Sequence, residues 1–339
     1  MQRKISAFFI CVFIDILLKL KYNYTDNKQN LISLKEGTFM KHLLKLGDLT
    51  SEEIFELLEL AEKLKFEKKN NIEKNYLKGK TLGMIFEKSS TRTRVSFEAG
   101  MHQLGGYPLF LSSNDLQIGR GEPVNDTARV LSRMIDGIMI RTFAQQEVED
   151  LAKYGSIPVI NGLTDYAHPC QVLADLLTIK EHKGKLEGLK ICFVGDGNNM
   201  ANSIIVGCIK AGMKVAIACP STNQPDSEIM AWANETGNLL VTDDILLAAK
   251  DSDVLYTDVW ASMGQEDEAE ERKKIFKGYQ INDELMAVAK EDAMVLHCLP
   301  AHREEEITAK VFEEHADEIF DQAENRLHAQ KAVLVKLLG

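Results

Sequence analysis

A short polar stretch at 89–94, Ser-Ser-Thr-Arg-Thr-Arg, separates a predicted strand from a predicted helix and strongly constrains the fold. The apolar run 81–86 before it predicts a buried strand, and residues 95–104 after it have apolar spacing close to a helical period. The first backbone N–H groups of a helix lack partners and favour anions. Donors that match phosphate oxygens come from Ser90, Thr91, Arg92, Thr93 and Arg94. The alternative, an ordinary helix cap with two solvated arginines, would suit a lone Ser or Thr better than the whole run.

The composition sets the class of protein. At 339 residues the chain is large enough for two α/β domains, and its 45% hydrophobic and 27% charged residues are typical of a globular protein. The formal charge of −11 argues against a nucleic-acid partner, so an anionic substrate would need a local basic site. The six cysteines have neither metal-ligand nor disulfide-framework spacing, which favours a reducing, cytoplasmic location.

Residues 1–39 differ from the rest of the chain. The apolar stretch 5–18 is interrupted by Asp15 and is too short for a membrane span. Lys35-Glu36-Gly37 can be encoded by AAGGAGG, which resembles a bacterial ribosome-binding site just before the codon of Met40. Our hypothesis is that 1–39 is a disordered translated leader and that Met40 starts the working protein. The alternative is a weak membrane or interaction anchor.

From Met40 onward, apolar runs alternate with amphipathic segments, the pattern of a doubly wound parallel sheet. Helices are predicted from Thr50 or Ser51, at 145–154, around 229–230 and from Glu324. The predicted strands are 81–86, 107–111, 135–140, 157–161, 190–194, 214–218, 239–241 and 254–257, and the alternation includes the segment 245–249. The sequence therefore predicts two doubly wound α/β domains, 40–183 and 184–324, joined by long helices. The last helix, 325–339, is expected to return to the first domain.

Two turns in the first half carry candidate ligand residues. Arg141 ends a predicted strand, where open α/β sheets bind ligands, although a lone arginine there is more often a surface ion pair. His168 precedes Pro169, which suits the first position of a helix, and Gln171 follows at the same rim. A histidine beside helix-end N–H donors tends to stay neutral and can polarise a carbonyl oxygen. The alternative is a capping histidine with a packed glutamine.

The second half contains three further turns at strand ends. The run 195–200 partly matches a dinucleotide fingerprint, but Met200 occupies the third glycine position, so nicotinamide binding is disfavoured. Asp258 follows a strand and offers a carboxylate for an ammonium group. Cys298 is either a reactive thiolate or a buried small hydrophobe. The acid-rich tract that follows Gly264 predicts a solvated helix, with Glu268–Arg272 and Glu270–Lys274 at supporting spacing.

Four motifs together resemble the aspartate/ornithine carbamoyltransferase family. Ser-Thr-Arg-Thr-Arg at 90–94 and His-Pro-Cys-Gln at 168–171 are similar to the motifs of the whole family. The sequence 258–264, with its Ser-Met-Gly, and His-Cys-Leu-Pro at 297–300 resemble the ornithine branch specifically. The resemblance covers 40–339 and implies transfer of a carbamoyl group from carbamoyl phosphate to the δ-amine of ornithine.

The resemblance also implies a role for each motif position. Phosphate of carbamoyl phosphate would be held by Ser90, Thr91, Arg92, Thr93, Arg141 and Gln117, the last from a neighbouring subunit. The carbamoyl group would be bound by Arg141, His168, Gln171, Cys298, Leu299 and Arg326. The ornithine α-amino and carboxylate groups would be held by Asn199, Asp258, Ser262 and Met263. Cys298 and Asp258 would face the δ-amine.

The implied chemistry is attack of a neutral amine on a carbonyl carbon with departure of phosphate. Fixed donors must stabilise the oxyanion that develops. The amine must lose a proton, and either Cys298 accepts it or the substrate enters neutral. The resemblance implies a homotrimer with sites between subunits, and neither a metal nor an organic cofactor. The alternatives are a putrescine carbamoyltransferase and a non-catalytic phosphate-binding paralogue.

Overall fold

The computed structural model describes residues 40–113, 115–261 and 268–339. The proposed leader and the predicted ornithine ligands Ser262 and Met263 lie outside the described residues. Residues 40–339 form one compact unit. Within it, the described strands build two parallel sheets, as the alternating pattern predicts.

The first sheet has the order β2-β1-β3-β4. Its strands are β1 (Thr81–Phe86), β2 (Tyr107–Ser112), β3 (Gly137–Arg141) and β4 (Val159–Leu163). The central strands β1 and β3 are almost wholly buried, which explains their unbroken apolar runs. The strand predicted at 157–161 begins two residues later, because Pro158 has no N–H to donate to a neighbouring strand. The Pro158 carbonyl oxygen still accepts from the Ile138 N–H.

Helices flank this sheet, and α2 and α3 begin at side-chain N-caps. They are α2 (Ser51–Lys69), α3 (Thr91–Gln103), α4 (Val124–Leu131) and α5 (Gln145–Tyr154), with short 3-10 turns η2 (Leu46–Asp48) and η3 (Ile118–Arg120). Thr50 caps α2 in a capping box with Glu53, in which each side chain bonds the other residue's backbone N–H. The predicted start of α2 is therefore confirmed.

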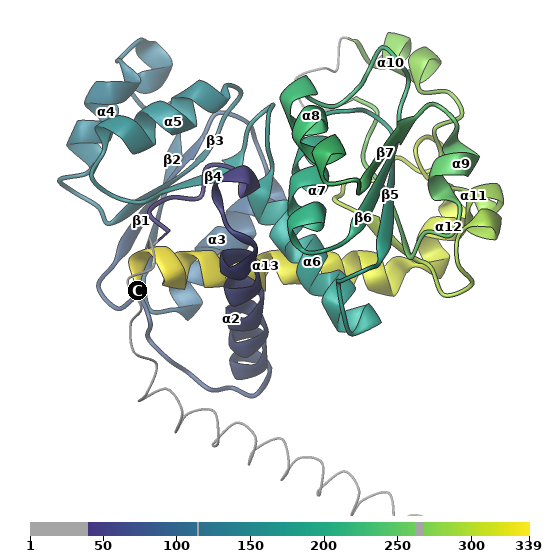
Figure 1. Ribbon diagram of the computed structural model, residues 1–339. Helices are drawn as coiled ribbons and strands as arrows, with labels where there is room; N and C mark the ends of the chain where they lie inside the picture. The colour runs from purple at the N-terminus through teal and green to yellow at the C-terminus, as the bar shows by residue number, and fades with distance from the viewer. Residues whose placement is uncertain (1–39, 114, 262–267) are drawn as a thin grey trace, which may run out of the picture. The chain divides into compact units, whose positions relative to one another are not determined.

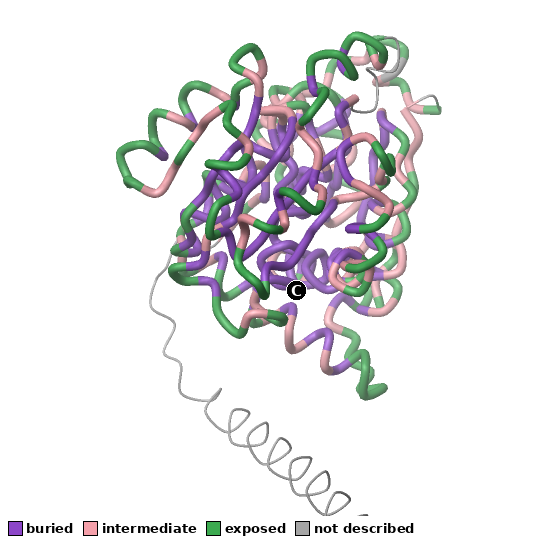
Figure 2. Tube along the Cα trace, turned by 90° about the vertical axis from the view of Figure 1, so that its right-hand side faces the viewer, coloured by how far each residue is buried: buried purple, intermediate pink, exposed green. Residues whose placement is uncertain are grey.

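The second sheet has the order β7-β6-β5-β8-β9. Its strands are β5 (Lys190–Val194), β6 (Lys214–Ala218), β7 (Leu239–Thr242), β8 (Val254–Thr257) and β9 (Met294–His297). Its helices are α7 (Asn199–Lys210), α8 (Ser227–Glu235), α9 (Ile245–Ala249), α10 (Ala269–Ile275), α11 (Asp283–Val288) and α12 (Ala309–Glu314). Figure 2 shows how burial concentrates along the strands and the helices that cover them.

Two long helices connect the sheets. α6 (Pro169–Lys183) packs along α13 (Ala316–Leu338), and α13 also contacts α2, α3 and β9, so it touches elements of both halves (Figure 1). The prediction that the last helix returns to the first domain is confirmed. Its predicted start at Glu324 is wrong, because the helix begins eight residues earlier, where buried Ile319 and Gln322 already face its neighbours.

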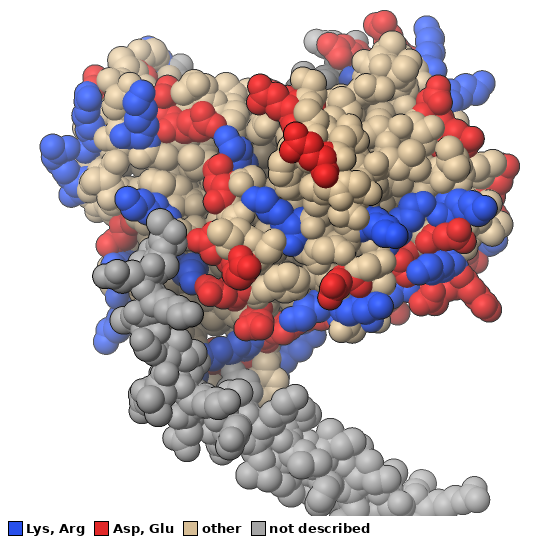
Figure 3. Space-filling view, viewed as in Figure 1, with Lys and Arg blue, Asp and Glu red and all other residues tan. Residues whose placement is uncertain are grey.

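On the face seen in Figure 3, acidic and basic side chains are interspersed over the described surface. None of the helices in the described ranges is long and apolar enough to cross a membrane. The basic groups that matter for an anion are instead concentrated in an internal cleft.

Candidate active site

A cleft of about 600 Å³ opens where the carboxyl ends of strands from both sheets meet. The first sheet contributes the residues after β1, β3 and β4, and the second contributes those after β5, β8 and β9. The predicted site residues that line it are Ser90, Thr91, Arg92, Thr93, Arg141, His168, Asn199, Asp258, Cys298, Leu299 and Arg326. Carboxyl ends of parallel strands are the usual ligand edge of such sheets.

The hydroxyl-rich turn forms the start of α3. Ser90 is the N-cap and its Oγ accepts from the Thr93 N–H at 3.2 Å, so helix geometry begins at Thr91. Arg92 therefore lies in the first helical turn and lines the cleft beside free helix-end N–H groups. Arg94 does not belong to the site, contrary to the sequence interpretation. It bonds Glu98 at 3.0 Å and lies over the Phe110 ring, because position 94 points to the opposite side of the helix.

Lys88 is a cleft residue that the sequence interpretation missed. Its side chain is buried, pairs with Asp165 and lies 4.1 Å over the Phe143 ring. Both partners also line the cleft. Its position in the sequence indicates such a role, because Lys88 is the first cationic residue after β1 and directly precedes the hydroxyl-rich turn.

Three guanidinium groups make the inner end of the cleft cationic. Burial, followed by repulsion from Arg326 and Arg92, lowers the pKa of Arg141 to about 10, so Arg141 is still charged at neutral pH. Arg326 donates to Gln171 Oε1 at 2.6 Å and to Thr93 Oγ1 at 3.1 Å. The charge of Arg326 is thus held in place by neutral hydrogen-bond partners.

His168 is neutral in this setting. Burial, and then the charges of Arg326, Arg141 and Arg92, lower its pKa well below the usual value. Its backbone N–H donates to Ser203 Oγ at 2.8 Å, which fixes the start of α6 against α7. Its Nδ1 has no hydrogen-bond partner within the described part of the chain. A neutral imidazole at this position can donate a hydrogen bond to a carbonyl oxygen without adding charge.

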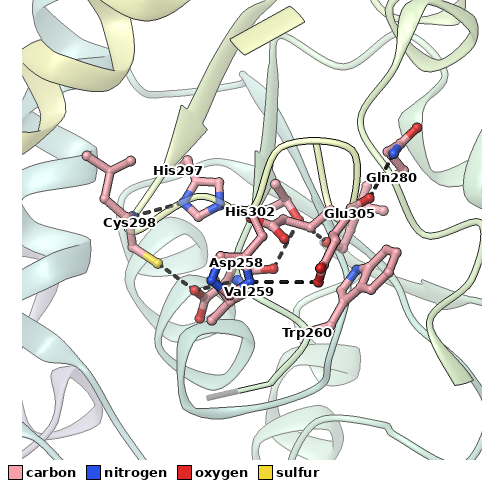
Figure 4. Close-up of polar contacts among 12 residues, drawn as sticks. Asp258, Val259, Trp260, Gln280, His297, Cys298, His302 and Glu305 are labelled. Atoms are coloured by element: carbon pink, nitrogen blue, oxygen red, sulfur yellow. Dashed lines mark hydrogen bonds and ion pairs between the residues drawn. The ribbon is translucent and has the colours of Figure 1, made fainter. Parts of the chain in front are cut away.

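The opposite wall joins the ends of β8 and β9. Cys298 Sγ donates to Asp258 Oδ1 at 2.9 Å, and Figure 4 shows the two side chains pointing toward each other. Burial, and then the Asp258 carboxylate, raise the pKa of the Cys298 thiol well above its usual value. The geometry therefore favours a thiol donor over the reactive thiolate considered from sequence.

Leu299 is supported by His297 and Glu306, to which the sequence interpretation assigned no role. The Leu299 N–H donates to His297 Nδ1 at 2.9 Å, and His297 Nε2 lies 2.9 Å from Glu306 Oε1. Leu299 has a φ of 59°, a conformation that costs a leucine energy and needs such support. The result is that the backbone after Cys298 has a fixed direction toward the cleft.

Asn199 connects the two walls. Its amide donates to the Thr164 carbonyl oxygen at 2.6 Å, across from the start of α7. The neighbouring Asn198 caps α7 by accepting from the N–H groups of Met200 and Ala201. Because the cap already uses these donors, this helix start is poorly suited to a dinucleotide pyrophosphate.

Other predicted residues lie elsewhere. Gln171 is buried behind the cleft, where it contacts Arg326 rather than lining the wall. Gln117 is exposed, directly before η3 and outside the cleft, so its contribution to a neighbouring subunit's site stays a prediction. The solvated face predicted for α10 is wrong at Arg272, which is buried and pairs with Asp196 instead of Glu268.

Among the described residues, one group resembles a metal site. Ligand atoms of His302, Glu305 and Glu306 lie within 4.8 Å of one another. Figure 4 shows His302 and Glu305. However, Glu305 is paired with Lys273 at 3.0 Å, and Glu306 Oε1 already accepts from the His302 N–H. These contacts explain the cluster without an ion, and the expectation that no metal or cofactor is needed stays a prediction.

The fold and the cleft together define a two-lobed α/β protein whose cleft is cationic on one wall and carries a thiol–carboxylate pair on the other. Two family models match the chain: the aspartate/ornithine carbamoyltransferase carbamoyl-P binding domain at residues 41–181, and the Asp/Orn binding domain at 187–337. The chain therefore belongs to the aspartate/ornithine carbamoyltransferase family.

Relatives from bacteria and archaea resemble nearly the whole of this chain. An ornithine carbamoyltransferase of Carboxydothermus hydrogenoformans is 59% identical over 304 residues, covering 88% of this chain and 98% of that protein. One from Oceanobacillus iheyensis is 54% identical and covers 93% of this chain and 99% of its own length. The structure of ornithine carbamoyltransferase from Pyrococcus furiosus has a TM-score of 0.84 at 52% identity, covering 88% of this chain and 97% of that one.

Proposed function

We propose that this protein transfers the carbamoyl group of carbamoyl phosphate to the δ-amine of L-ornithine, giving L-citrulline and phosphate. The observation that carries the proposal is that one cleft holds both Arg92 and Arg141 on one side and the Asp258–Cys298 pair on the other. The relatives named above, all called ornithine carbamoyltransferases, support the same substrate.

In this proposal the phosphate binds at the start of α3. Ser90, Thr91, Arg92 and Thr93 supply N–H, hydroxyl and guanidinium donors, and Arg141 completes the charge. The carbonyl oxygen of the substrate accepts from Arg141 and from neutral His168, with Arg326 and Gln171 behind them. As the tetrahedral oxyanion forms, these fixed donors stabilise it, and the same arginines stabilise the leaving phosphate.

Ornithine binds at the opposite wall of the cleft. Asp258 and Asn199 hold the α-amino and carboxylate groups, together with Ser262 and Met263, and the Cys298 thiol directs the δ-amine toward the carbonyl carbon. Because the thiol already carries its proton, we propose that the amine enters the reaction neutral and that Cys298 orients it.

We further propose a homotrimer in the cytoplasm that acts in arginine metabolism. Exposed Val95, Tyr107 and Phe110 lie on α3 and on the edge strand β2, a surface suited to a neighbouring copy that would bring Gln117 to the cleft. The five cysteines of the described ranges are free thiols, which suits a reducing compartment. We assign carbamoyl-phosphate binding to 40–183 with 325–339, and ornithine binding to 184–324.

The test is a product assay combined with a mass measurement. Purified protein is given carbamoyl phosphate with ornithine, putrescine or aspartate, and citrulline and phosphate are measured together. Equal amounts of citrulline and phosphate with ornithine alone are expected, from a particle of three chains. Turnover with putrescine would indicate a putrescine carbamoyltransferase. No product with any acceptor would indicate a non-catalytic phosphate-binding paralogue.

A further inference from the structure

A buried polar cluster behind the cleft joins the two walls of the active site. It consists of Gln171 and Asp175 on α6, Gln322 on α13 and Tyr256 on β8, and we call it the Asp175 bridge. Each of these four side chains is at most 1% exposed. Of the four, only Gln171 takes part in the proposed reaction, behind Arg326.

Asp175 Oδ1 is the common acceptor of the bridge. It accepts from Gln171 Nε2 at 2.8 Å and from Gln322 Nε2 at 2.7 Å, so one oxygen fixes two amide groups from different helices. If this acceptor were removed, the buried Gln171 amide would lose its acceptor and Gln322 would keep only the Tyr256 hydroxyl, and an unpaired buried donor is unfavourable. The position of each glutamine is thus tied to the position of the other.

Each glutamine then reaches one wall of the cleft. Gln171 Oε1 accepts from Arg326, and Arg326 donates onward to Thr93 in the phosphate turn. Gln322 Oε1 accepts from the backbone N–H of His297 at 2.9 Å, directly before Cys298. Gln322 also donates to the Tyr256 hydroxyl at 3.0 Å, two residues before Asp258. A continuous path of hydrogen bonds therefore runs from the phosphate turn to both strand ends of the opposite wall.

We propose that Asp175 and Gln322 are positioning residues that couple the two substrate sites, so that occupation of the phosphate turn orders the Asp258–Cys298 wall. The proposal rests on the proposed function and assigns to these residues the coupling between its two substrates. A phosphate that draws Arg326 and Thr93 toward it shifts Gln171, and the shared oxygen of Asp175 transmits the shift to Gln322 and to the backbone before Cys298. Contiguous networks of this kind carry coupling when both ends bias one arrangement.

The simpler reading is that the bridge only packs α6 against α13. A second polar cluster on the same two helices serves as the control for that reading. Asn325 donates to Thr178 Oγ1 at 2.9 Å and to Glu181 at 2.7 Å, and it accepts from Lys65. Asn325 and Thr178 are as buried as the bridge, whereas Glu181 reaches the surface, and none of these residues lines the cleft. It packs the helices without touching either substrate wall.

The experiment measures how much one substrate analogue strengthens binding of the other. Phosphonoacetamide, with CH₂ in place of the bridging oxygen, stands in for carbamoyl phosphate, and L-norvaline stands in for ornithine without its δ-amine. Calorimetry gives the Kd of norvaline with and without phosphonoacetamide, and the ratio of the two is the coupling factor. The factor is measured for the intact wild-type protein, Asp175→Leu, Asp175→Asn, Gln322→Met and Asn325→Leu, together with kcat and the Tm.

We expect Asp175→Leu and Gln322→Met to lower the coupling factor at least tenfold and kcat at least thirtyfold. Asp175→Asn keeps the accepting oxygen, so its factor should stay within threefold of wild type. Asn325→Leu should lower the Tm while its factor stays within threefold. Gln322→Met is expected to preserve the packing of α6 against α13. It therefore tests the coupling role if Asp175→Leu does not fold.

An unchanged factor in Gln322→Met, or an equal loss in Asn325→Leu, would overturn the coupling role. Either result, obtained with a wild-type protein that makes citrulline, leaves the proposed function intact. A wild-type protein that makes no citrulline fails the proposed function itself, so the two failures are distinguishable.

Discussion

The two walls of the cleft are built in different ways. The phosphate wall takes most of its donors from one unbroken run at the start of α3, reinforced by Arg141 and Arg326. The opposite wall takes Asn199, Asp258 and Cys298 from three separate strand ends of the second sheet. The first wall is cationic and matches a phosphate, whereas the second is a thiol–carboxylate pair with an amide, which matches an amine.

The difference shows how each wall depends on the rest of the fold. A helix start presents its N–H groups wherever the helix forms, so the phosphate wall is largely a local structure. The second wall exists only when β5, β8 and β9 are in register, and it needs His297, Glu306 and Gln322 to fix the turn around Cys298. Substitutions in the two walls should therefore have separable effects on ligands bound one at a time, whereas the coupling proposed for the Asp175 bridge acts when both sites are occupied.

The largest effect is expected from Arg92→Ala. Loss of two charge-assisted hydrogen bonds to phosphate costs about 4 kcal/mol, which lowers kcat/KM for carbamoyl phosphate roughly a thousandfold. Arg94→Ala is the matched control, because this neighbouring arginine contacts Glu98 and Phe110 and should change kcat/KM less than about threefold. Steady-state kinetics that showed equal losses in the two variants would contradict the assignment of Arg92.

Asp258→Asn tests the opposite wall. The variant removes the charge that pairs with an ammonium group but keeps the size of the side chain, so kcat/KM for ornithine should fall about a hundredfold. The Kd of phosphonoacetamide, measured by calorimetry, should change less than about threefold, because Asp258 lies on the other wall. A matching loss of phosphonoacetamide affinity would mean that the walls are not separable.

Cys298 should be unreactive because its thiol is held protonated. The raised pKa, caused by burial and by Asp258, predicts slow alkylation by iodoacetamide at pH 7.5. In Asp258→Asn the neighbouring charge is gone, the pKa of the thiol falls, and the rate should rise about tenfold by mass spectrometry of the Cys298 peptide. Fast alkylation of the wild-type residue would instead identify a thiolate and reopen its role as a proton acceptor.

The smallest effect on activity, but a measurable one on stability, is expected from Asp175→Asn. Burial raises the pKa of Asp175 to about 7, so the folded protein holds a proton that the unfolded chain loses above pH 4. The free energy of unfolding therefore falls as the pH rises from 4 to 7, by roughly 2–4 kcal/mol from this group. Urea titrations at pH 5 and 7 should show this fall in the free energy of unfolding for wild type but not for Asp175→Asn. An equal fall in both proteins would contradict the raised pKa of Asp175.

The sequence predicted the local features well. Apolar runs gave β1, β5, β6 and β8 to the residue, because a strand buried on both faces has an unbroken hydrophobic pattern. The cap of α2 and the Pro169 start of α6 were predicted from chemistry that involves only neighbouring residues. The start of α13 shifted because tertiary contacts decide it, whereas β4 starts later because Pro158 has no N–H to donate.

The parts that could not be predicted depend on contacts between distant residues. Nothing near Asp175 or Gln322 in the sequence indicates that their side chains are hydrogen-bonded, since 147 positions separate them. Arg94 matched the phosphate pattern by composition, and only the helical rotation after Ser90 turns it away. The ornithine wall was assigned from the resemblance to the family rather than from spacing, because its residues come from three strand ends.

The central claim, that a cationic wall and a thiol–carboxylate wall bind two substrates in one cleft, is tested most directly by a crystal structure with N-δ-phosphonoacetyl-L-ornithine. We expect the phosphonate to contact the start of α3 and Arg141, and the amino-acid end to contact Asn199 and Asp258. A phosphonate bound away from Arg92, or an amino-acid end that points out of the cleft, would contradict it.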